Sequence, residues 1–290
     1  MTQDRPGPGS GPTVRRMLVG AQLRRLRTEA GISREEAAEA IRASEWKIHR
    51  LENGQVGFKD RDIVDLLRLY GVTDPEEVAG FLEFAREANA PGWWQHYGDL
   101  LPQWFRVFVD LESAATLIRT YEGQLVPGLL QTEDYMRAVI AGSQLDEQAE
   151  EGERRVALRM ARQTLLTRPD APRLWAVIDE AALRRPVGSP EVMRGQLERL
   201  IDATKLASAV LQILPLGAGA HPGMVGAFSI LRFADQELPD VVYVEHLTNA
   251  QYLDRREDVN RYLHVMDQIS MRAAPPNETV DILHRILRES

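Results

Sequence analysis

The sequence contains no cysteine, which excludes a disulfide framework, a cysteine nucleophile and any thiolate metal site. It also has no apolar run near the ~18 residues that a membrane-spanning helix needs. Residues 1–13 are rich in Pro, Gly and Ser and lack the apolar core of a secretion signal. We therefore expect a disordered tail at residues 1–13 of a soluble, cytoplasmic protein with no membrane partner.

Complete catalytic motifs are absent as well. There is no His-Glu-x-x-His pattern, and the loop 217–223 fits neither the phosphate loop nor the dinucleotide fingerprint. His221, Glu245 and His246 are the remaining candidates for a metal site or an acid–base pair. Glu245 and His246 are adjacent, so their side chains point to opposite faces if the preceding strand continues through them. The sequence thus predicts that the protein is not an enzyme and holds no cofactor and no metal.

The charge is unevenly distributed along the 290 residues, a length that allows about two domains. Residues 14–70 contain 12 Lys and Arg against 9 Asp and Glu, whereas residues 71–290 contain 22 against 33. A net charge of −8 therefore divides into a slightly basic N-terminal part and an acidic remainder. This pattern favours a DNA-binding module joined to a sensing or assembly domain, with a chance excess of charge as the alternative.

Residues 14–43 predict two helices. Apolar side chains recur at helical spacing from Leu18 to Ala30, and Gly31 then ends the first helix. Ser33 begins the second helix, and Glu36 follows three residues later. This spacing is typical of a capping box, in which hydroxyl and carboxylate each accept a free backbone N–H.

Three further helices follow by the same signals. Ser44 caps the third, which Asn53-Gly54 ends, and Gly71 ends the fourth. Asp74-Pro75 begins the fifth, since proline suits a first turn where no N–H donor is needed.

The second and third predicted helices have the spacing of a helix-turn-helix, in which the later helix enters the DNA major groove. Ile48 and Leu51 point inward, which leaves the other faces of helix 44–51 free. Arg34 begins the earlier helix, at a place where a helix N-terminus can meet a phosphate. The side chains expected to face the groove are Ser44, Glu45, Trp46, Lys47 and Arg50.

Residues Leu23 to Tyr70, which end in the pattern Ile48-x-x-Leu51-Glu52-Asn53-Gly54, resemble the Cro/CI-type, or xenobiotic-response-element, helix-turn-helix. The resemblance implies a structural brace between Arg27 and Glu52. It also implies two sets of DNA contacts. Base-reading positions are Glu45, Trp46, Lys47 and Arg50, and phosphate positions are Arg34 and Asn53.

Two residues depart from the polar amides often found at these positions. Trp46 can either contact a thymine methyl or pack on a neighbouring helix. Glu45 places a negative charge on the groove face, which gives some weight to the alternative that the module no longer binds DNA and makes only protein contacts.

The chain after residue 90 predicts alternating strands and helices. We expect strands at 174–178, 209–214, 226–233 and 241–245, with helices at 154–166, 191–203, 259–269 and 278–287, the last capped by Asn277. The aromatic stretch 91–108 favours a core or an interface over a ligand-stacking site. Four arginines of the helix 154–166 either contact phosphate or form a solvated face, namely Arg154, Arg155, Arg159 and Arg162.

The predicted fold class is mainly α with an α+β C-terminal domain. A five-helix, lambda-repressor-like helix-turn-helix domain at 14–90 precedes a mixed domain with a small sheet at 91–290.

A second resemblance involves the segment Gly123-Gln124-Leu125-Val126-Pro127-Gly128-Leu129-Leu130-Gln131-Thr132. It is similar to a signature that follows this type of helix-turn-helix in many actinobacterial regulators, as are Trp93-Trp94 before it and Val242–Glu245 after it. The resemblance implies a transcription regulator related to antitoxin-like regulators, often encoded beside a small partner protein. It implies no ligand site by residue.

These observations predict a sequence-specific transcription regulator that binds double-stranded DNA as a homodimer and is nucleoid-associated when bound. Helix 44–51 reads the major groove, and the acidic C-terminal domain senses a small-molecule effector or a partner. The alternative is an antitoxin-like interaction protein that binds a small partner protein and autoregulates its own operon.

Overall fold

The computed structural model describes residues 12–90, 92–143, 149–234 and 238–289. Residues 1–11 of the predicted disordered tail lie outside the described residues, and residues 12 and 13 belong to the first helix. The chain divides into two compact units. The first contains residues up to 95, residues 107–114 and Leu238, and the second contains the other described residues. No helix in the described ranges is long and apolar enough to cross a membrane.

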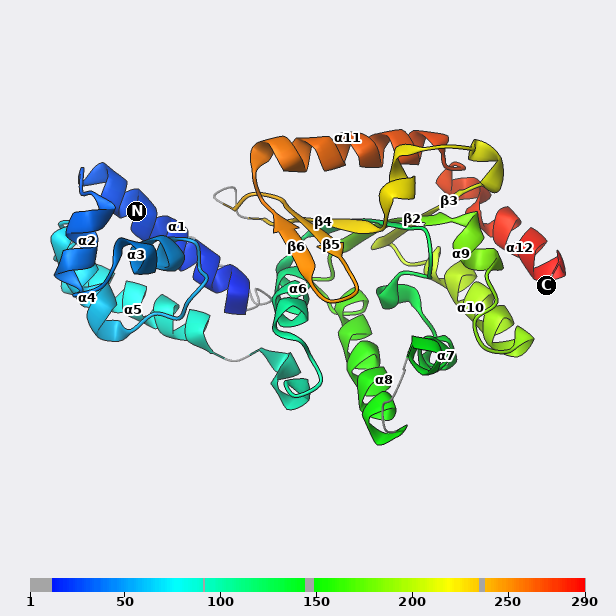
Figure 1. The fold of residues 1–290 in the computed structure, drawn as a ribbon, viewed down its shortest axis with the longest axis horizontal. Coiled ribbons are helices and arrows are strands. Elements are labelled where there is room, and N and C mark those ends of the chain that lie inside the picture. Colours follow the sequence, from blue (N-terminus) through cyan, green and yellow to red (C-terminus); the bar gives the residue numbers. More distant parts are fainter. Residues whose placement is uncertain (1–11, 91, 144–148, 235–237, 290) are drawn as a thin grey trace. The chain divides into compact units, whose positions relative to one another are not determined.

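The first unit begins with the helices that the sequence predicts (Figure 1). They are α1 (Pro12–Glu29), α2 (Arg34–Ala40), α3 (Glu45–Glu52), α4 (Asp60–Leu69) and α5 (Pro75–Asn89). Their apolar faces meet in one core, where Leu23, Ile48, Leu51, Ile63 and Leu67 are each at most 1% exposed. The helical spacing of these residues therefore places one stripe of each helix inside.

Three helices of this unit end at the glycines that the sequence indicates. Gly31, Gly54 and Gly71 have φ values of 71°, 65° and 85°. The amide after each glycine donates to the carbonyl five residues back, and the glycine amide donates to the carbonyl three residues back. This is the Schellman motif, which satisfies carbonyls that the helix leaves free and requires a left-handed residue.

Helix α2 ends in the same way without a glycine. Arg42 occupies the left-handed position with φ of 52°, while its amide donates to Glu39 O and the Ala43 amide donates to Ala38 O. A side chain with a Cβ atom is strained in this conformation. The turn of the helix-turn-helix therefore contains the one strained non-glycine backbone position of the described residues.

The aromatic segment begins with a short 3-10 helix (Trp93–Tyr97) and continues into α6 (Gln103–Ala114). Within the first unit, Trp94 Nε1 donates to Asp110 Oδ1 at 2.6 Å, and Phe108 is buried. Trp93 remains 43% exposed. Part of this stretch is thus core, in agreement with the core-or-interface prediction.

The second unit is built on a sheet of six strands. The strands are β1 (Leu117–Glu122), β2 (Arg173–Asp179), β3 (Ala209–Leu214), β4 (Phe228–Arg232), β5 (Val241–Glu245) and β6 (Ala250–Leu253). The helices are α7 (Glu133–Ser143), α8 (Ala149–Gln163), α9 (Glu180–Arg184), α10 (Pro190–Ala203), α11 (Arg256–Arg272) and α12 (Thr279–Glu289). The predicted α+β character is therefore confirmed.

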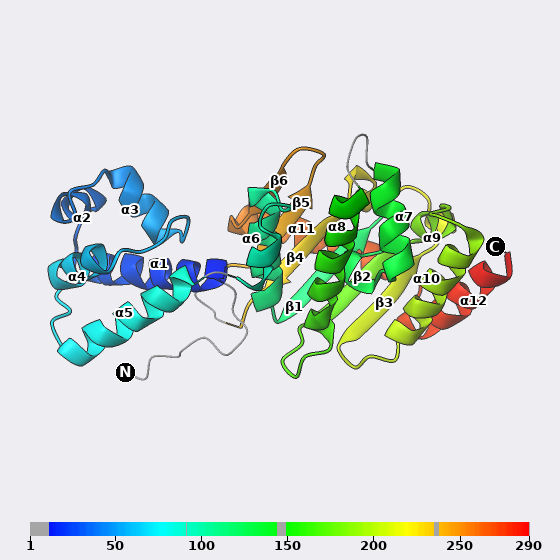
Figure 2. The ribbon, with the colours of Figure 1, turned by 90° about the horizontal axis from the view of Figure 1, so that it is seen from below.

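The strand order is β3-β2-β1-β4-β5-β6. The strands β1, β2 and β3 are parallel, whereas β4, β5 and β6 continue the sheet antiparallel. Helix α11 covers one face, where Met266 and Ile269 are fully buried against strand residues that include Val177 and Val242. Helices α7, α8 and α10 lie on the other face (Figure 2).

Strands β1 and β6 and helices α6 and α9 were not predicted, and two details of other helices differ from the expectations. The central strand β1 was not predicted because Arg119, Thr120 and Glu122 interrupt its apolar pattern, and β6 has only four residues. Helix α8 ends at Gln163, and a 3-10 turn follows it. Asn277 does not cap the last helix, since it lies inside a 3-10 turn that precedes Thr279.

We expect Arg42→Gly to raise the free energy of unfolding of the first unit by about 1 kcal/mol. Relief of left-handed strain gains roughly 1–2 kcal/mol, and the greater freedom of glycine in the unfolded chain offsets part of it. Urea denaturation followed by circular dichroism measures the change.

The matched control is Gly71→Ala, because Gly71 has φ of 85° and no atom within 4 Å of an added Cβ. The Gly71→Ala variant should have a free energy of unfolding about 1 kcal/mol lower, because its new Cβ atom is strained at this positive φ. A loss of stability in Arg42→Gly contradicts the assignment of strain to this turn.

Candidate functional site

The helix-turn-helix is formed by α2, residues 41–44 and α3. The predicted capping box is present, since the Glu36 amide donates to Ser33 Oγ and the Ser33 amide donates to Glu36 Oε2. Ser44 caps α3 by accepting from the Lys47 amide at 3.3 Å. Ile48 and Leu51 are buried, so the opposite side of α3 faces outward.

Glu52 connects three helices at the end of α3. Its side chain is 2% exposed and receives Arg27 from α1 and Arg34 from α2. Arg27 also donates to Ile32 O at 2.8 Å, and the hydrogen bond to Glu52 raises the pKa of Arg27. Removing one partner of a buried ion pair is strongly destabilising, so this contact fixes how α3 lies on α1 and α2.

The outward side of α3 presents an aromatic pair and a free cation. Trp46 is 65% exposed and stacks on His49, with ring centroids 5.3 Å apart. It therefore does not pack on a neighbouring helix, which was one of its two predicted roles. Glu45 is exposed, and Arg50 is half-buried, with no hydrogen bond or ion pair from its side chain to any residue that the structure describes.

The other predicted DNA contacts already have partners within the chain. Lys47 Nζ lies 2.6 Å from Asp62 Oδ2, and Arg34 Nε lies 3.1 Å from Glu52 Oε2. Asn53 Nδ2 donates to His49 O at 2.8 Å. Exposed ion pairs contribute little, so a phosphate can compete for Arg34, whose side chain is 42% exposed.

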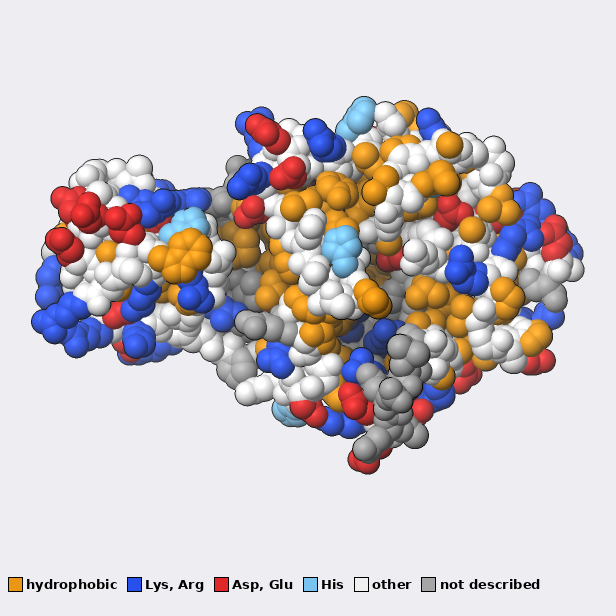
Figure 3. Space-filling model, viewed as in Figure 1, with side chains coloured by type: hydrophobic (Ala, Val, Ile, Leu, Met, Phe, Trp, Pro, Cys, Tyr) orange, Lys and Arg blue, Asp and Glu red, His pale blue; other side chains and the backbone are white. Residues whose placement is uncertain are grey.

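Charges on this surface are separated. Acidic side chains gather over α2, and Lys and Arg side chains gather below them over α4 (Figure 3). A surface that tracks a nucleic-acid backbone needs such a basic region beside the reading helix.

The second unit contains a pocket of about 430 Å³ at the carboxyl ends of β1, β2 and β3. It exists because β4 pairs with β1 on the side away from β2. The chain must therefore cross the ends of β2 and β1 after β3 ends. This crossing segment, residues 215–227, forms one wall of the pocket. Open sheets bind ligands at such a place, outside the carboxyl ends of parallel strands.

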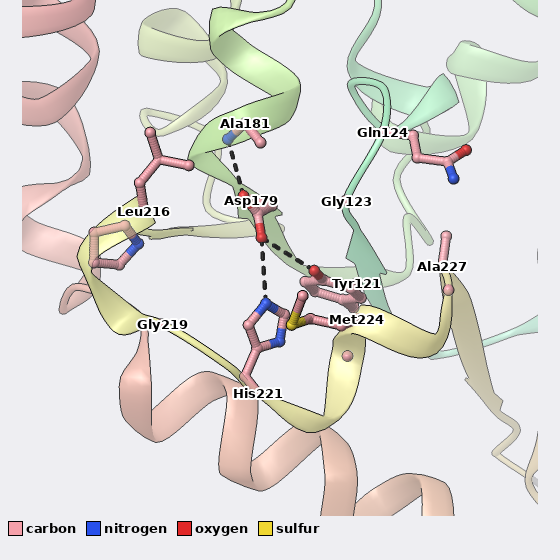
Figure 4. Close-up of a pocket in the computed structure, with 13 residues that line it drawn as sticks. Tyr121, Gly123, Gln124, Asp179, Ala181, Leu216, Gly219, His221, Met224 and Ala227 are labelled. Atoms are coloured by element: carbon pink, nitrogen blue, oxygen red, sulfur yellow. Dashed lines mark hydrogen bonds and ion pairs between the residues drawn. The ribbon is translucent and has the colours of Figure 1, made fainter.

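Three polar side chains meet in the pocket (Figure 4). Tyr121 Oη donates to Asp179 Oδ2 at 3.2 Å, and His221 Nε2 lies 3.5 Å from the same oxygen. Asp179 Oδ1 accepts from the Ala181 amide at the start of α9. Burial, and then the charge of Asp179, raises the pKa of Tyr121, so its hydroxyl stays protonated.

A second charged cluster lies on the opposite face of the sheet. Burial, and then the negative charge of Glu245, raises the pKa of Glu122 to about 8, while the charge of Arg162 opposes the shift. Tyr243 Oη donates to Glu245 Oε2 at 2.9 Å. Burial, and then the charge of Arg162, lowers the pKa of Arg159.

Two family models match the chain. Residues 18–81 match a helix-turn-helix domain, and residues 105–285 match a family described as a domain of unknown function, DUF5753. The second match covers more than half of the 290 residues. The chain belongs to the DUF5753 family. No curated protein and no solved structure matches it.

The DUF5753 region separates the three residues that the sequence analysis named as candidates for a metal site or an acid–base pair. His221 lines the pocket, whereas Glu245 ends β5 on the other face and His246 is exposed in the β5–β6 turn. No group of three or more potential ligands that could hold a metal occurs within the described ranges. The partner that His221 does have, Asp179, was missed. Its signal was an acidic residue at the end of an apolar strand.

The arginines of α8 in the DUF5753 region do not form one solvated face. Arg154 pairs with Asp99 at 2.6 Å, and Arg155 pairs with Glu151 at 3.1 Å. Arg159 and Arg162 are half-buried beside the Glu122 cluster instead.

We expect Glu122→Gln to stabilise the protein at high pH. A pKa raised from 4.5 to about 8 means that the native state holds this proton more tightly than the unfolded state. In the wild-type protein, the stabilisation that protonated Glu122 contributes is complete below the pKa that this group has in the unfolded state. It is lost as the pH rises through about 8. At about pH 9 the variant should gain at least about 1.4 kcal/mol, the equivalent of one pKa unit.

Urea denaturation at about pH 5 and about pH 9 measures this gain, and Glu198→Gln removes an equal charge at an exposed position of α10. An equal effect of Glu122→Gln at both pH values contradicts the raised pKa.

Proposed function

We propose that this chain is a sequence-specific transcription regulator that binds double-stranded DNA as a homodimer. The observation that carries the proposal is the outward face of α3, where Trp46 is exposed and Arg50 has no partner among the described residues, within a matched helix-turn-helix domain. In such motifs the second helix enters the major groove. The Cro/CI-type resemblance of residues 23–70 supports the same placement.

Arg50 has the chemistry for direct base readout in this proposal. A guanidinium donates two hydrogen bonds to guanine O6 and N7, and Arg50 has no intramolecular bond to give up. Trp46 offers an apolar face to a thymine methyl, and its stack on His49 fixes the ring. Arg34 contacts a phosphate, which replaces part of its ion pair with Glu52.

Dimerisation follows from the small size of the reading helix. The eight residues of α3 span few base pairs, and proteins of this class gain affinity by binding two half-sites about one helical turn apart. The DUF5753 unit supplies the dimer surface and the sensing site in this proposal, and it has no catalytic role.

Arg50→Ala should weaken binding to the specific site by about 5- to 150-fold, corresponding to about 1–3 kcal/mol for a bidentate base contact. Binding to scrambled DNA should change little, so the specificity ratio falls. Fluorescence anisotropy on DNA from upstream of the chain's own gene, across a salt series, measures both affinities.

The matched control is Arg194→Ala, which removes the same charge from an exposed position of α10. It should leave the specificity ratio unchanged. Absence of specific binding at low salt, or a complex that sediments with a single protein chain per DNA site, contradicts the proposal.

A second candidate function is antitoxin-like binding of a small partner protein. The crossing segment and α11 leave large apolar side chains in solvent, with Met224 70%, Val225 96% and Met271 78% exposed. Exposed apolar groups of this size mark protein contacts when they are contiguous. Calorimetry of the chain with the small protein encoded beside it should then show binding, and Val225→Glu should abolish it. Binding by neither free nor DNA-bound protein excludes this function.

A further inference from the structure

We propose that the pocket at the carboxyl ends of β1–β3 binds a small molecule with a protonated amine on an apolar body. This inference names the effector class of the sensing unit, and its regulatory meaning rests on the proposed function. The binding site itself is defined by the second unit alone, since every residue that lines it belongs to that unit.

The wall of the pocket is fixed at three points, by two hydrogen bonds and one close packing contact. The Leu216 amide donates to Glu180 Oε2 at 3.1 Å, and Arg272 Nη1 donates to Ala220 O at 2.7 Å. Gly223 lies so close to Tyr121 that an added Cβ would come within 2.8 Å of the ring. The crossing segment is therefore anchored at its start, its middle and its return, as a preformed site requires.

The first of these contacts is made by a charged side chain, Glu180. Burial alone would raise the pKa of Glu180, but bonds from the Leu216 amide and Arg184, together with the charges of Arg184 and Arg285, lower it. Glu180 therefore stays ionised and keeps its bond to the pocket wall. The nearby cations Arg184 and Arg285 are occupied by Glu180, and Arg184 also pairs with Glu289.

The polar end of the pocket offers acceptors. Tyr121 Oη and His221 Nε2 are both directed at Asp179. In the neutral tautomer that carries its proton on Nε2, the acceptors left over are the Tyr121 oxygen lone pairs and His221 Nδ1. The His221 side chain is 6% exposed, and its Nδ1 has no hydrogen-bond partner. A buried ring nitrogen without a partner is costly, and a ligand that donates a proton to it removes that cost.

The charge of the pocket determines which sign of ligand charge is favoured. Asp179 contributes a carboxylate, and no Lys or Arg is among the residues that line the pocket. An ammonium group carries three donors and a positive charge, which matches an acceptor set beside a carboxylate. An anionic ligand would find a like charge and no cationic donor.

Apart from Gln124 and four glycines, the remaining residues that line the pocket are apolar. Pro215, Leu216, Met224, Ala181 and Ala227 surround the polar end. Leu216 and Met224 are 57% and 70% exposed, so an apolar ligand body at the mouth of the pocket would cover them. The volume of about 430 Å³ falls in the range of small-molecule sites.

Calorimetry of the DNA-free full-length protein tests the proposal with three compounds that share one body. They are phenethylamine, 2-phenylethanol and phenylacetate, whose head groups are cationic, neutral and anionic. Phenethylamine should bind at least about tenfold more tightly than the other two, as a charge-assisted hydrogen bond predicts. Isoamylamine and tryptamine extend the test to smaller and larger bodies.

Asp179→Asn keeps the size of the side chain and its cap on α9 but removes the charge, and should weaken amine binding at least about tenfold. Asp202→Asn, at an exposed position of α10, should leave it unchanged. If Asp179→Asn fails to fold, Ala227→Phe narrows the pocket while keeping its hydrogen bonds and should also abolish binding.

Preference for phenylacetate, equal binding of the three head groups, or no binding of any of the amines overturns the proposal. Amine binding without specific DNA binding leaves the site intact and removes the regulatory role. Specific DNA binding without amine binding leaves the proposed function intact and removes this inference.

Discussion

The pairing of β4 with β1, on the side away from β2, is the constraint on which the second unit depends. The chain leaves β3 at the far edge of the parallel strands and must return past β2 and β1 before it can begin β4. That return places His221 above Asp179 and brings Gly223 against Tyr121. The pocket is thus a consequence of strand order, and Tyr121 meets His221 there although 100 positions separate them in the chain.

A comparable role in the first unit belongs to one buried carboxylate. Glu52 ends α3, and its carboxylate pairs with Arg27 of α1 and with Arg34 of α2. Because Glu52 and Arg27 are both largely buried, their ion pair stabilises the unit and holds α3 on α1, whereas the pair with the more exposed Arg34 contributes less. The outward side chains of α3 take their positions from this arrangement, while Lys47 is held separately by Asp62 on α4.

The sequence predicts local structure well and distant partners poorly. Ser33 with Glu36, Gly31, Gly54 and Gly71 are signals that act within a few residues, and the structure uses each of them. In contrast, β1 is a buried central strand with Arg119 and Glu122 on it, and only its neighbours make those residues acceptable. Arg119 pairs with Asp267 and lies over Trp175, contacts that no local pattern encodes. For the same reason, no local pattern in the sequence indicates that Asp179 and His221 lie side by side.

The strand that was hardest to predict connects the two charged sites of the second unit. Tyr121 and Glu122 are adjacent on β1, so one side chain enters the pocket on the α11 side and the other enters the cluster on the α8 side. Their partners on β2 are also adjacent, because Tyr121 pairs with Val177 and Glu122 pairs with Ile178, while Tyr121 also pairs with Phe228 of β4. Tyr121 in the pocket and Glu122 in the cluster are therefore held by the same end of β1. Polar residues in a central strand have this consequence, since they place two titratable environments on opposite faces of one rigid element.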